Sequence, residues 1–256
     1  MSLYLASLNS GSNGNCYYVG NERDAVLIDA GISCRETERR MVRLGLPLQK
    51  VKAIFISHEH TDHVCGMEVL SRKHRIPVYI TGKTYHNGRL KLEPQLMVPF
   101  VAGTPVQIGD LSIHPFLKRH DASEPHSFTV SGGGITAGVF TDIGIACDQV
   151  IYHLGQCHAA FLEANYDEKM LERGRYPLYL KRRIRGEEGH LSNDQALELF
   201  TTHRAPWLKL LVLSHLSAIN NHPQLVHDLF TRNANGAQIV VASRYEETGV
   251  FCINET

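Results

Sequence analysis

Hydrophobic positions along this chain fall into short runs that alternate with polar turns and with helical segments. Runs rich in β-branched and aromatic residues, bounded by turn-forming residues, predict strands. The expected strands cover residues 3–8, 16–19, 25–28, 51–56, 77–80, 127–131, 135–140, 159–162, 208–213, 238–242 and 250–253, with a hairpin at 106–113. Helices are expected at residues 34–44, 67–74, 147–154, 167–173, 194–203 and 222–231.

The order of these elements predicts the architecture. A β-meander opens the chain, units of strand and helix follow, and the same succession then occurs a second time. Two similar halves, each a mixed sheet faced by helices, are therefore expected. No linker or low-complexity tract divides the 256 residues. A length of this kind fits one large domain or two small ones, and we predict a single α/β domain over residues 1–256.

Composition narrows the class of protein further. Lys and Arg together number 26, as do Asp and Glu, so no overall charge favours a polyanionic partner. Fifteen histidines point to metal chemistry, and six scattered cysteines suit free thiols in a reducing compartment. The start of the chain resembles no signal peptide, and no apolar run suffices for a membrane span. We therefore expect a cytoplasmic protein that does not engage membranes.

The densest cluster of metal-binding side chains lies at residues 57–66, directly after the apolar strand 51–56. Its sequence is Ser-His-Glu-His-Thr-Asp-His-Val-Cys-Gly, and we place it on a loop at the C-terminal end of that strand. Imidazoles and a carboxylate at this spacing suit borderline-soft divalent ions. His58 and His60 can converge on one ion, while Asp62 and His63 can turn toward a second.

Other predicted strands also lead into side chains that can bind a metal ion or support a ligand. These are Asp29, His120, Asp142, Glu163 and His215. In α/β architecture such strand ends share one edge of the sheet, where ligands collect. Asp29 is not needed as a helix cap, because Ser33 is the better cap for helix 34–44. We therefore expect Asp29 to support the histidine loop from behind.

The run Ser-His-x-His-x-Asp-His after an apolar strand, with Val-Leu-Ile-Asp-Ala-Gly at residues 26–31, resembles the metallo-β-lactamase superfamily. The resemblance implies a four-layer αβ/βα sandwich. It also implies two divalent metal ions per chain. Zinc is the favoured metal, and manganese and iron are alternatives. The implied ligands are His58, His60 and His120 for one ion, Asp62, His63 and His215 for the other, and Asp142 as the bridging carboxylate.

Three of these positions have plainer interpretations. His120 stands among charged neighbours and could be a surface residue. Asp142 precedes Ile-Gly and could simply form a turn, and His215 could be a core or capping histidine. A tight turn is likewise the plainer interpretation of the Gly- and Ser-rich run at residues 9–15, whose backbone amides could otherwise cradle a phosphate.

Two later segments narrow the resemblance. Gly-His-Leu-Ser-Asn at residues 189–193 and Ser-His-Leu-Ser at 214–217 are similar to paired segments of ribonuclease Z. That similarity makes His190, paired with Glu163, the proton donor to the leaving oxygen. The predicted catalytic residues are therefore Asp62, His190 and Glu163.

Further motifs cover nearly the whole chain. Ser-Gly-Ser-x-Gly-Asn at residues 10–15, His-Asp-Ala at 120–122 and Glu-Ala-Asn-x-Asp at 163–167 resemble the YycJ (WalJ)-like bacterial subgroup. This resemblance implies a 5′-to-3′ exonuclease that acts on DNA. Two positions depart from the subgroup's pattern: Tyr166 stands where a histidine is expected, and His126 stands where a glycine is expected. His126 could be a substrate contact or a solvated loop histidine.

The most basic run of the chain precedes His190. It contains Lys181, Arg182, Arg183 and Arg185. The run could steer a phosphate backbone into the site, or it could be a solvated helix face.

The leading functional hypothesis is a binuclear metal-dependent phosphodiesterase that acts on nucleic acid, with a metal-bridging hydroxide as nucleophile. One alternative is a thioesterase or other small-molecule hydrolase of the glyoxalase II type, which shares the metal ligands. Another is a non-catalytic scaffold with a vestigial site. The His190–Glu163 pair favours the phosphodiesterase, because thiolate leaving groups need little protonation. DNA against RNA, strand polarity and oligomeric state stay open.

Overall fold

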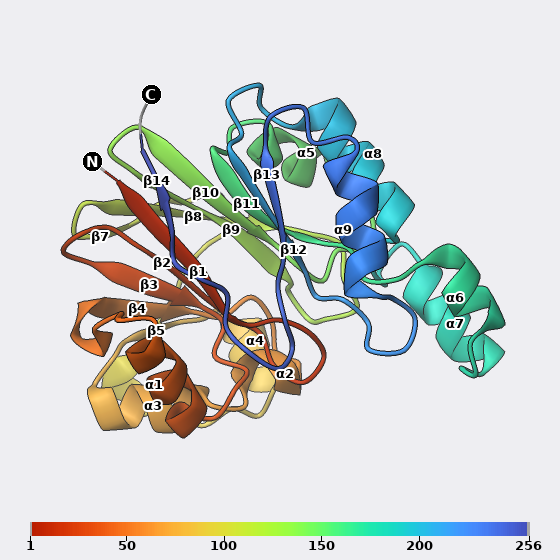
Figure 1. Cartoon of the computed structure of the whole chain (residues 1–256). Coiled ribbons are helices and arrows are strands. Elements are labelled where there is room, and N and C mark those ends of the chain that lie inside the picture. The colour runs from red at the N-terminus through yellow and green to blue at the C-terminus, as the bar shows by residue number, and fades with distance from the viewer. Residues whose placement is uncertain (1, 255–256) are drawn as a thin grey trace.

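Two seven-stranded sheets packed face to face form the centre of the protein (Figure 1). The structure is a computed structural model, and it describes residues 2–254. The first sheet has the order β14-β1-β2-β3-β4-β5-β6, and the second has the order β13-β12-β11-β10-β9-β8-β7. In both sheets an antiparallel part joins a parallel part, from β3 to β6 and from β10 to β13. The two mixed sheets confirm the predicted halves.

All strands except β6 overlap the predicted apolar runs. Their bounds are β1 Leu3–Asn9, β2 Cys16–Gly20, β3 Ala25–Ile28, β4 Val51–Phe55, β5 Val78–Tyr79, β6 Met97–Val98, β7 Val106–Ile108, β8 Leu111–Leu117, β9 His126–Gly132, β10 Ile135–Phe140, β11 Ala159–Glu163, β12 Leu210–Ser214, β13 Gln238–Val241 and β14 Phe251–Ile253.

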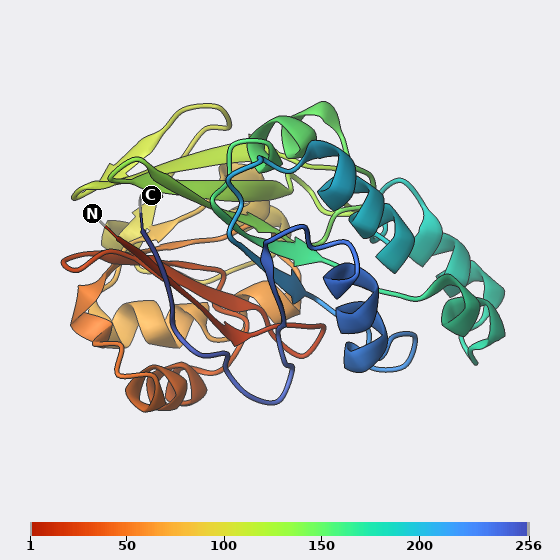
Figure 2. The same cartoon turned by 45° about the horizontal axis from the view of Figure 1, so that its top comes forward.

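Helices lie on the outer faces of both sheets, as Figure 2 shows. Their bounds are α1 Cys34–Arg43, α2 Thr61–Val64, α3 Met67–His74, α4 Gly82–Asn87, α5 Asp148–Leu154, α6 Glu168–Arg173, α7 Leu178–Arg185, α8 Asn193–His203 and α9 Pro223–Thr231, with short 3₁₀ turns at Leu48–Lys50 and Pro94–Leu96. Among residues 2–254 no helix is long and apolar enough to cross a membrane.

Aromatic side chains join the two sheets across the inner core. Tyr17 of β2 meets Phe161 of β11 with 4.9 Å between ring centroids, and Phe55 of β4 meets Phe128 of β9 at 5.7 Å. Each sheet also buries its outer face against helices: α1 and α3 cover the first sheet, and α5, α8 and α9 cover the second. The resulting layers, helix, sheet, sheet and helix, are the predicted αβ/βα sandwich.

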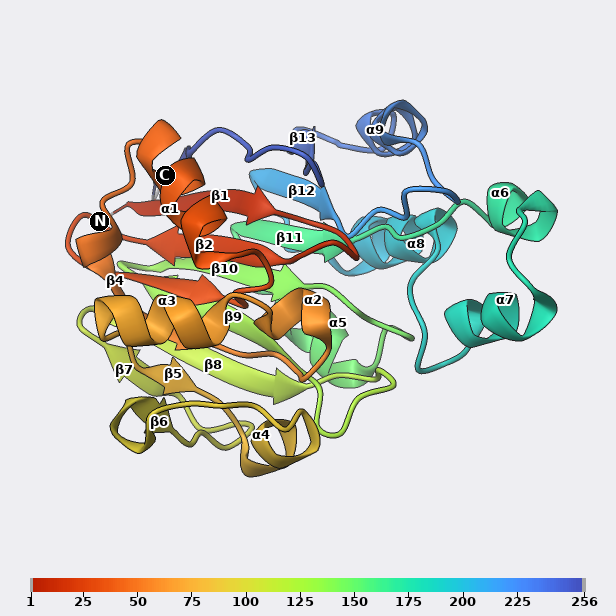
Figure 3. The same ribbon diagram turned by 90° about the horizontal axis from the view of Figure 1, so that it is seen from below.

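Local signals account for several helix ends. Ser33 caps α1 by accepting a hydrogen bond from the backbone NH of Glu36, as the sequence predicts. Ser192 caps α8 in a capping box with Gln195. Helices α6 and α7 project from the body of the molecule beyond α8 (Figure 3).

Candidate metal centre

The histidine run begins after β4, but it is not all loop. Thr61 to Val64 form the short helix α2, with His60 at its N-cap, so the prediction of a loop throughout the run was wrong. Two carbonyl groups of α2 accept hydrogen bonds from distant amides: Asp62 from Asn15 at 2.7 Å, and His63 from Ala30 at 2.9 Å. These long-range contacts fix the direction of the Asp62 and His63 side chains.

Close approach of the backbone explains a glycine in the segment after β3. A Cβ atom at Gly31 would lie 1.7 Å from the carbonyl oxygen of Asp62. Only glycine permits α2 to pack so near the end of β3. The Ala-Gly that follows Asp29 is therefore a packing requirement of the site.

The turn at residues 10–15 packs against the same helix. Gly14 donates to the carbonyl of Gly11 at 2.9 Å, and Gly11 donates to the Asn15 side chain at 3.0 Å. Together with the Asn15 bond to α2, these contacts use the backbone amides internally. The tight-turn interpretation fits this segment better than a phosphate cradle.

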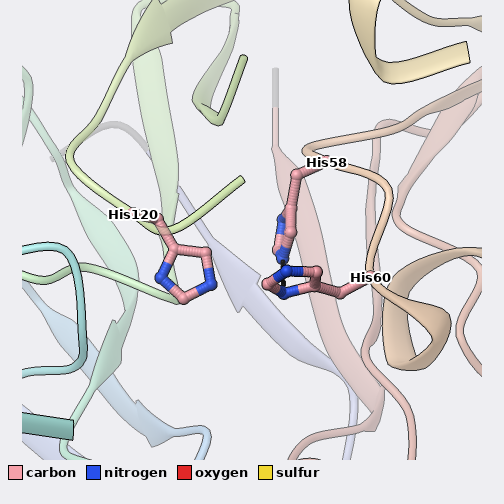
Figure 4. A group of neighbouring side chains, drawn as sticks. All are labelled: His58, His60 and His120. Atoms are coloured by element: carbon pink, nitrogen blue, oxygen red, sulfur yellow. Dashed lines mark hydrogen bonds between the residues drawn. The ribbon is translucent and has the colours of Figure 1, made fainter. Parts of the chain in front are cut away.

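Three imidazoles form the first side-chain cluster of the site. His58, His60 and His120 each place a nitrogen atom within 4.8 Å of the other two. Figure 4 shows the three rings gathered together, although His120 comes from the loop after β8. The Nδ1–H group of His120 donates to the Gly189 carbonyl at 3.1 Å, which leaves the Nε2 lone pair free. His120 is only 5% exposed, which contradicts the surface interpretation.

The second cluster contains Asp62, His63 and His215. The Nε2 atoms of His63 and His215 lie 3.5 and 3.6 Å from Asp62 Oδ2. Asp142 reaches toward both clusters: its carboxylate oxygens are 3.2 Å from His63 Nε2, 3.4 Å from His215 Nε2 and 3.9 Å from His120 Nε2. The structure therefore brings all seven sequence-predicted ligands together, with Asp142 in the central position.

Sharp backbone turns after strands aim three of these side chains. Asp29, Asp142 and His215 have left-handed backbone angles, with φ of 62°, 54° and 55°. Asp and His are among the residues that adopt this region more often than others. The chain thus turns abruptly after β3, β10 and β12 and directs polar groups into the space between the sheets.

Buried polar atoms test whether the residues fit a metal ion. His120 Nε2, His215 Nε2 and Asp142 Oδ2 are buried and have no hydrogen-bond partner in the described part of the chain. Such atoms are costly unless a partner is supplied. Each faces the centre of the site, and imidazole nitrogen with carboxylate oxygen is a donor set that suits zinc and related divalent ions. The residues fit the metal that the fold implies.

The two clusters differ in their electrostatics. Burial, followed by the charge of His63, holds the pKa of His58 well below its usual value, and burial lowers the pKa of His120 to about 3. In the second cluster burial opposes protonation, but Asp142 and other carboxylates outweigh it and raise the pKa of His63 well above normal and that of His215 to about 10. A metal ion bound there would take the place of these protons.

Two buried carboxylates hold histidines from behind. Asp29 accepts from His63 Nδ1 at 2.7 Å, and from the backbone NH and the hydroxyl of Ser57, both at 2.8 Å. Glu163 accepts from His215 Nδ1 at 3.0 Å and from His190 Nδ1 at 2.8 Å. Such bonds fix the tautomer and orientation of each ring.

Glu163 stays ionised despite its complete burial. Burial alone would raise its pKa, but His190 and then His215 outweigh that effect and lower the pKa to about 2. The His190 side chain is 22% exposed, so it faces solvent at the mouth of the site while its Nδ1 is held. The His190–Glu163 pairing expected from the sequence is therefore present in the structure.

The basic run lies on helix α7, and most of its charges are engaged. Lys181 donates to the Glu172 carbonyl, Arg183 pairs with Asp121 beside His120, and Arg185 pairs with Glu168 and Glu172. Arg182 is exposed and makes no ion pair within residues 2–254. The ion pair between Arg183 and Asp121 places the helix next to the site. Because most of its basic side chains are already engaged, fewer charges are available to a phosphate than the sequence suggests.

Lys118 is a buried residue of the site that the sequence analysis did not single out. It is 5% exposed, and its Nζ donates to the Thr141 carbonyl at 2.6 Å, immediately before Asp142. Burial lowers its pKa, while Asp142 and Asp29 oppose that shift. The sequence does indicate this burial, because side chains two residues apart in a strand point to the same face of the sheet and Lys118 lies two residues after the buried Phe116.

The two departures from the subgroup's pattern are buried. His126 is 1% exposed at the start of β9, where its ring packs against Phe100 with 4.9 Å between ring centroids, so the expectation of a solvated loop residue was wrong. Its role as a substrate contact stays a prediction. Burial lowers its pKa to about 4. Tyr166 is likewise buried and forms a β-bridge with Ser192, which positions the segment after His190.

Comparisons with known proteins agree with this geometry. Residues 24–216 match the family described as "Beta-lactamase superfamily domain". Exodeoxyribonuclease YycJ of Bacillus anthracis is 34% identical over 230 residues, which cover 88% of this chain and 86% of the relative. Exodeoxyribonuclease WalJ of Streptococcus pneumoniae is 31% identical over 225 residues, covering 86% and 84%.

A solved structure supports the fold independently. The metallo-β-lactamase fold protein YhfI from Bacillus subtilis superposes with a TM-score of 0.76 at 15% sequence identity, over 98% of this chain and 100% of that one. At this identity the likeness concerns the fold alone. The sandwich, the metal-binding side chains at its edge and the sequence matches lead to one conclusion: the chain belongs to the β-lactamase superfamily, in the family of the YycJ and WalJ proteins.

Proposed function

We propose that this protein is a binuclear metal-dependent phosphodiesterase that degrades DNA from the 5′ end. The observation that carries the proposal is the position of His190. Its Nδ1 lies 2.8 Å from Glu163 and 3.9 Å from Asp142, so a histidine held by a carboxylate stands beside the central ligand of the two clusters.

The ligand set accounts for the chemistry that metal ions would contribute. Divalent ions held by the two clusters and Asp142 would provide a hydroxide near neutral pH and positive charge for the phosphate oxygens. Zinc suits these imidazole-rich clusters best, with manganese or iron as alternatives.

His190 supplies the proton that a sugar oxygen needs on leaving. Because the Nδ1–H group of His190 donates to Glu163, the proton transferred to the leaving oxygen would come from Nε2. Glu163 is fully buried and ionised, so it stabilises the positive charge on His190 before transfer. A thiolate leaving group requires little of this help, which disfavours the thioesterase alternative.

DNA is proposed as the substrate because the relatives YycJ and WalJ are named as exodeoxyribonucleases. The 5′-to-3′ direction follows the resemblance to that subgroup. Helix α7 makes a weaker contribution: Arg183 joins it to Asp121 beside His120, and Arg182 on the same helix is an exposed charge that a nucleic-acid backbone could contact.

One experiment separates the alternatives. Metal-reconstituted protein is incubated side by side with DNA labelled at the 5′ or the 3′ end, with RNA of the same sequence, and with a generic thioester. Rapid release of mononucleotide from the 5′ label, and slow release from the 3′ label, is expected on DNA. If RNA is turned over faster than DNA, the substrate assignment changes from DNA to RNA. If the thioester is turned over faster than DNA, the proposal of a phosphodiesterase is overturned.

A further inference from the structure

A cavity of about 430 Å³ is lined from Leu216 onward, the residue directly after the candidate ligand His215. It lies between the segment that follows β12, including Leu216 and Ser217, and the segment that follows β13. Ser10 also lines it, and the Ser10 hydroxyl accepts a hydrogen bond from the backbone NH of His215 at 2.7 Å. The wall of the cavity is therefore continuous with the backbone of a candidate metal ligand.

An exposed aromatic ring and an arginine stand at the rim of this cavity. Tyr245 is 79% exposed, the highest value among the large hydrophobic side chains of residues 2–254. The Arg244 guanidinium donates to the neutral oxygens of Ser12 and Asn13, at 3.1 and 3.5 Å, and pairs with no carboxylate of the described chain. Its charge stays available to an anion, in contrast to Arg183 on α7, which is paired with Asp121.

Hydrogen bonds hold this exposed segment in place. The buried Arg40 of α1 donates to the Tyr245 carbonyl at 2.9 Å and to the Leu8 carbonyl at 2.6 Å. Asn13 donates to the Arg244 carbonyl at 2.8 Å. Figure 1 shows the segment between β13 and β14 running beside the turn after β1. A ring presented on a tethered backbone loses little conformational entropy when a ligand binds.

We propose that this cavity binds one nucleotide of a single-stranded nucleic acid, with its base against Tyr245 and a phosphate on Arg244. An aromatic ring beside an unpaired cation is the arrangement that binds single strands without sequence preference. The volume lies in the range of small-ligand pockets. Bases in a duplex are already stacked, so the cavity selects an unpaired end. The proposal rests on the proposed nuclease function.

The rim also carries a group that opposes the ligand. Glu246 lines the same cavity and is exposed, so its carboxylate would repel a nearby phosphate. Replacing Glu246 with glutamine should therefore strengthen binding modestly, while Arg244→Ala weakens it. Opposite effects from positions only two residues apart are hard to obtain from a general change in folding.

Binding is measured first, without turnover. A fluorescent single-stranded oligonucleotide is titrated with each variant in EDTA, and the dissociation constant is read from anisotropy. Tyr245→Ala should weaken binding on the order of 10- to 100-fold, whereas Tyr245→Phe keeps the stacking face and should bind like the wild type. Tyr152→Ala, which removes a ring that is 61% exposed on α5, is the matched control and should have no effect. Melting temperatures of all variants establish that they are folded.

Catalysis then separates this proposal from the function on which it rests. Tyr245→Ala should raise KM for single-stranded DNA and leave turnover of bis(p-nitrophenyl) phosphate unchanged, because the small ester does not reach the cavity. If the wild type cleaves DNA and Tyr245→Ala binds it equally well, the cavity assignment fails and the nuclease function stands. If the wild type cleaves no nucleic acid, the function fails. The anisotropy comparison in EDTA then still decides whether the cavity binds nucleotides.

Discussion

Two buried carboxylates in opposite sheets, Asp29 and Glu163, each hold a candidate ligand histidine, but they differ in what else they bind. Each is fully buried at the end of a strand, and each accepts from the Nδ1 atom of a histidine in the second cluster, at 2.7 and 3.0 Å. Asp29 also accepts hydrogen bonds from the backbone NH and the hydroxyl of Ser57, and these bonds fix the start of the histidine run. Glu163 instead holds a second histidine, His190, at the mouth of the site. The first carboxylate therefore only supports a candidate metal ligand, whereas the second also positions His190, the general acid of the proposed function.

The largest expected loss of metal and of activity comes from removing the histidine that either carboxylate holds, His63 for Asp29 or His215 for Glu163. His63→Ala and His215→Ala should each reduce the metal content from about two ions per chain to about one, because each deletes a ligand of the same cluster. DNA cleavage should fall by more than the ~10²–10⁴-fold that loss of a general acid produces. Elemental analysis after dialysis measures the metal content. Retention of both ions in either variant would contradict the ligand assignment.

Removing His190 should produce a smaller and different defect. His190→Ala should keep both ions and bind DNA, yet turn over ~10²–10⁴-fold more slowly, because a general acid is lost. On bis(p-nitrophenyl) phosphate, whose leaving group needs no proton, the defect should shrink. If His190→Ala loses metal, or is equally slow on the activated ester, His190 is not the acid and the thioesterase alternative gains support.

Exchanging the carboxylates for amides separates their two roles. In Asp29→Asn and Glu163→Gln an amide NH₂ can face the Nδ1–H of a ligand histidine, so both variants should lose about 10–100-fold in metal affinity. At saturating metal, Asp29→Asn should recover DNA cleavage, whereas Glu163→Gln should stay slow because His190 has lost its support. Titration with a competing chelator gives the affinities. Equal recovery of both variants would remove the distinction between the two carboxylates.

The smallest effect is expected on α7. Replacing Lys181, Arg182 and Arg183 with alanine should weaken DNA binding, and each lost phosphate contact should reduce the log–log salt slope by roughly 0.9 on duplex DNA. Because Arg183 is paired with Asp121, Arg182 should account for most of the change. Arg182→Ala alone is therefore the informative comparison, with binding measured across salt concentrations. An unchanged slope would assign this helix to a solvated surface.

Most of the fold is predictable because its strands carry clear apolar runs and several helices, such as α1, α6 and α8, begin at a Ser or Asp cap. The short helix α2 is not, since its geometry depends on amides of Asn15 and Ala30 that meet it only in the folded chain. Helix α4 has few apolar positions; Thr81 caps it, and only Thr84 within it is buried. Strand β6 spans Met97–Val98 alone and is defined by pairing with β5.

The site divides in the same way. His58 to His63 form one motif that is visible without any structure. His120, Asp142 and His215 are far apart in the chain. Their places after predicted strands indicate a shared edge, and the resemblance to the metallo-β-lactamase superfamily identifies them as ligands. Lys118 follows the period of two along β8, but its charged neighbours in the sequence indicate a surface position. Tyr245, near the C-terminus, carries no pattern of its own. Their burial and exposure are decided by tertiary contacts.

Asp142 shows that the active centre and the stability of the fold make opposing demands on one position. Its left-handed backbone costs on the order of 1 kcal/mol for a residue with a side chain. Its buried Oδ2 lies 3.2 Å from His63 Nε2 but accepts no well-formed hydrogen bond within residues 2–254, which adds a desolvation cost. Glycine would relieve both costs at once. An aspartate at this turn is therefore a cost to the stability of the metal-free fold, and a bound metal ion would offset that cost.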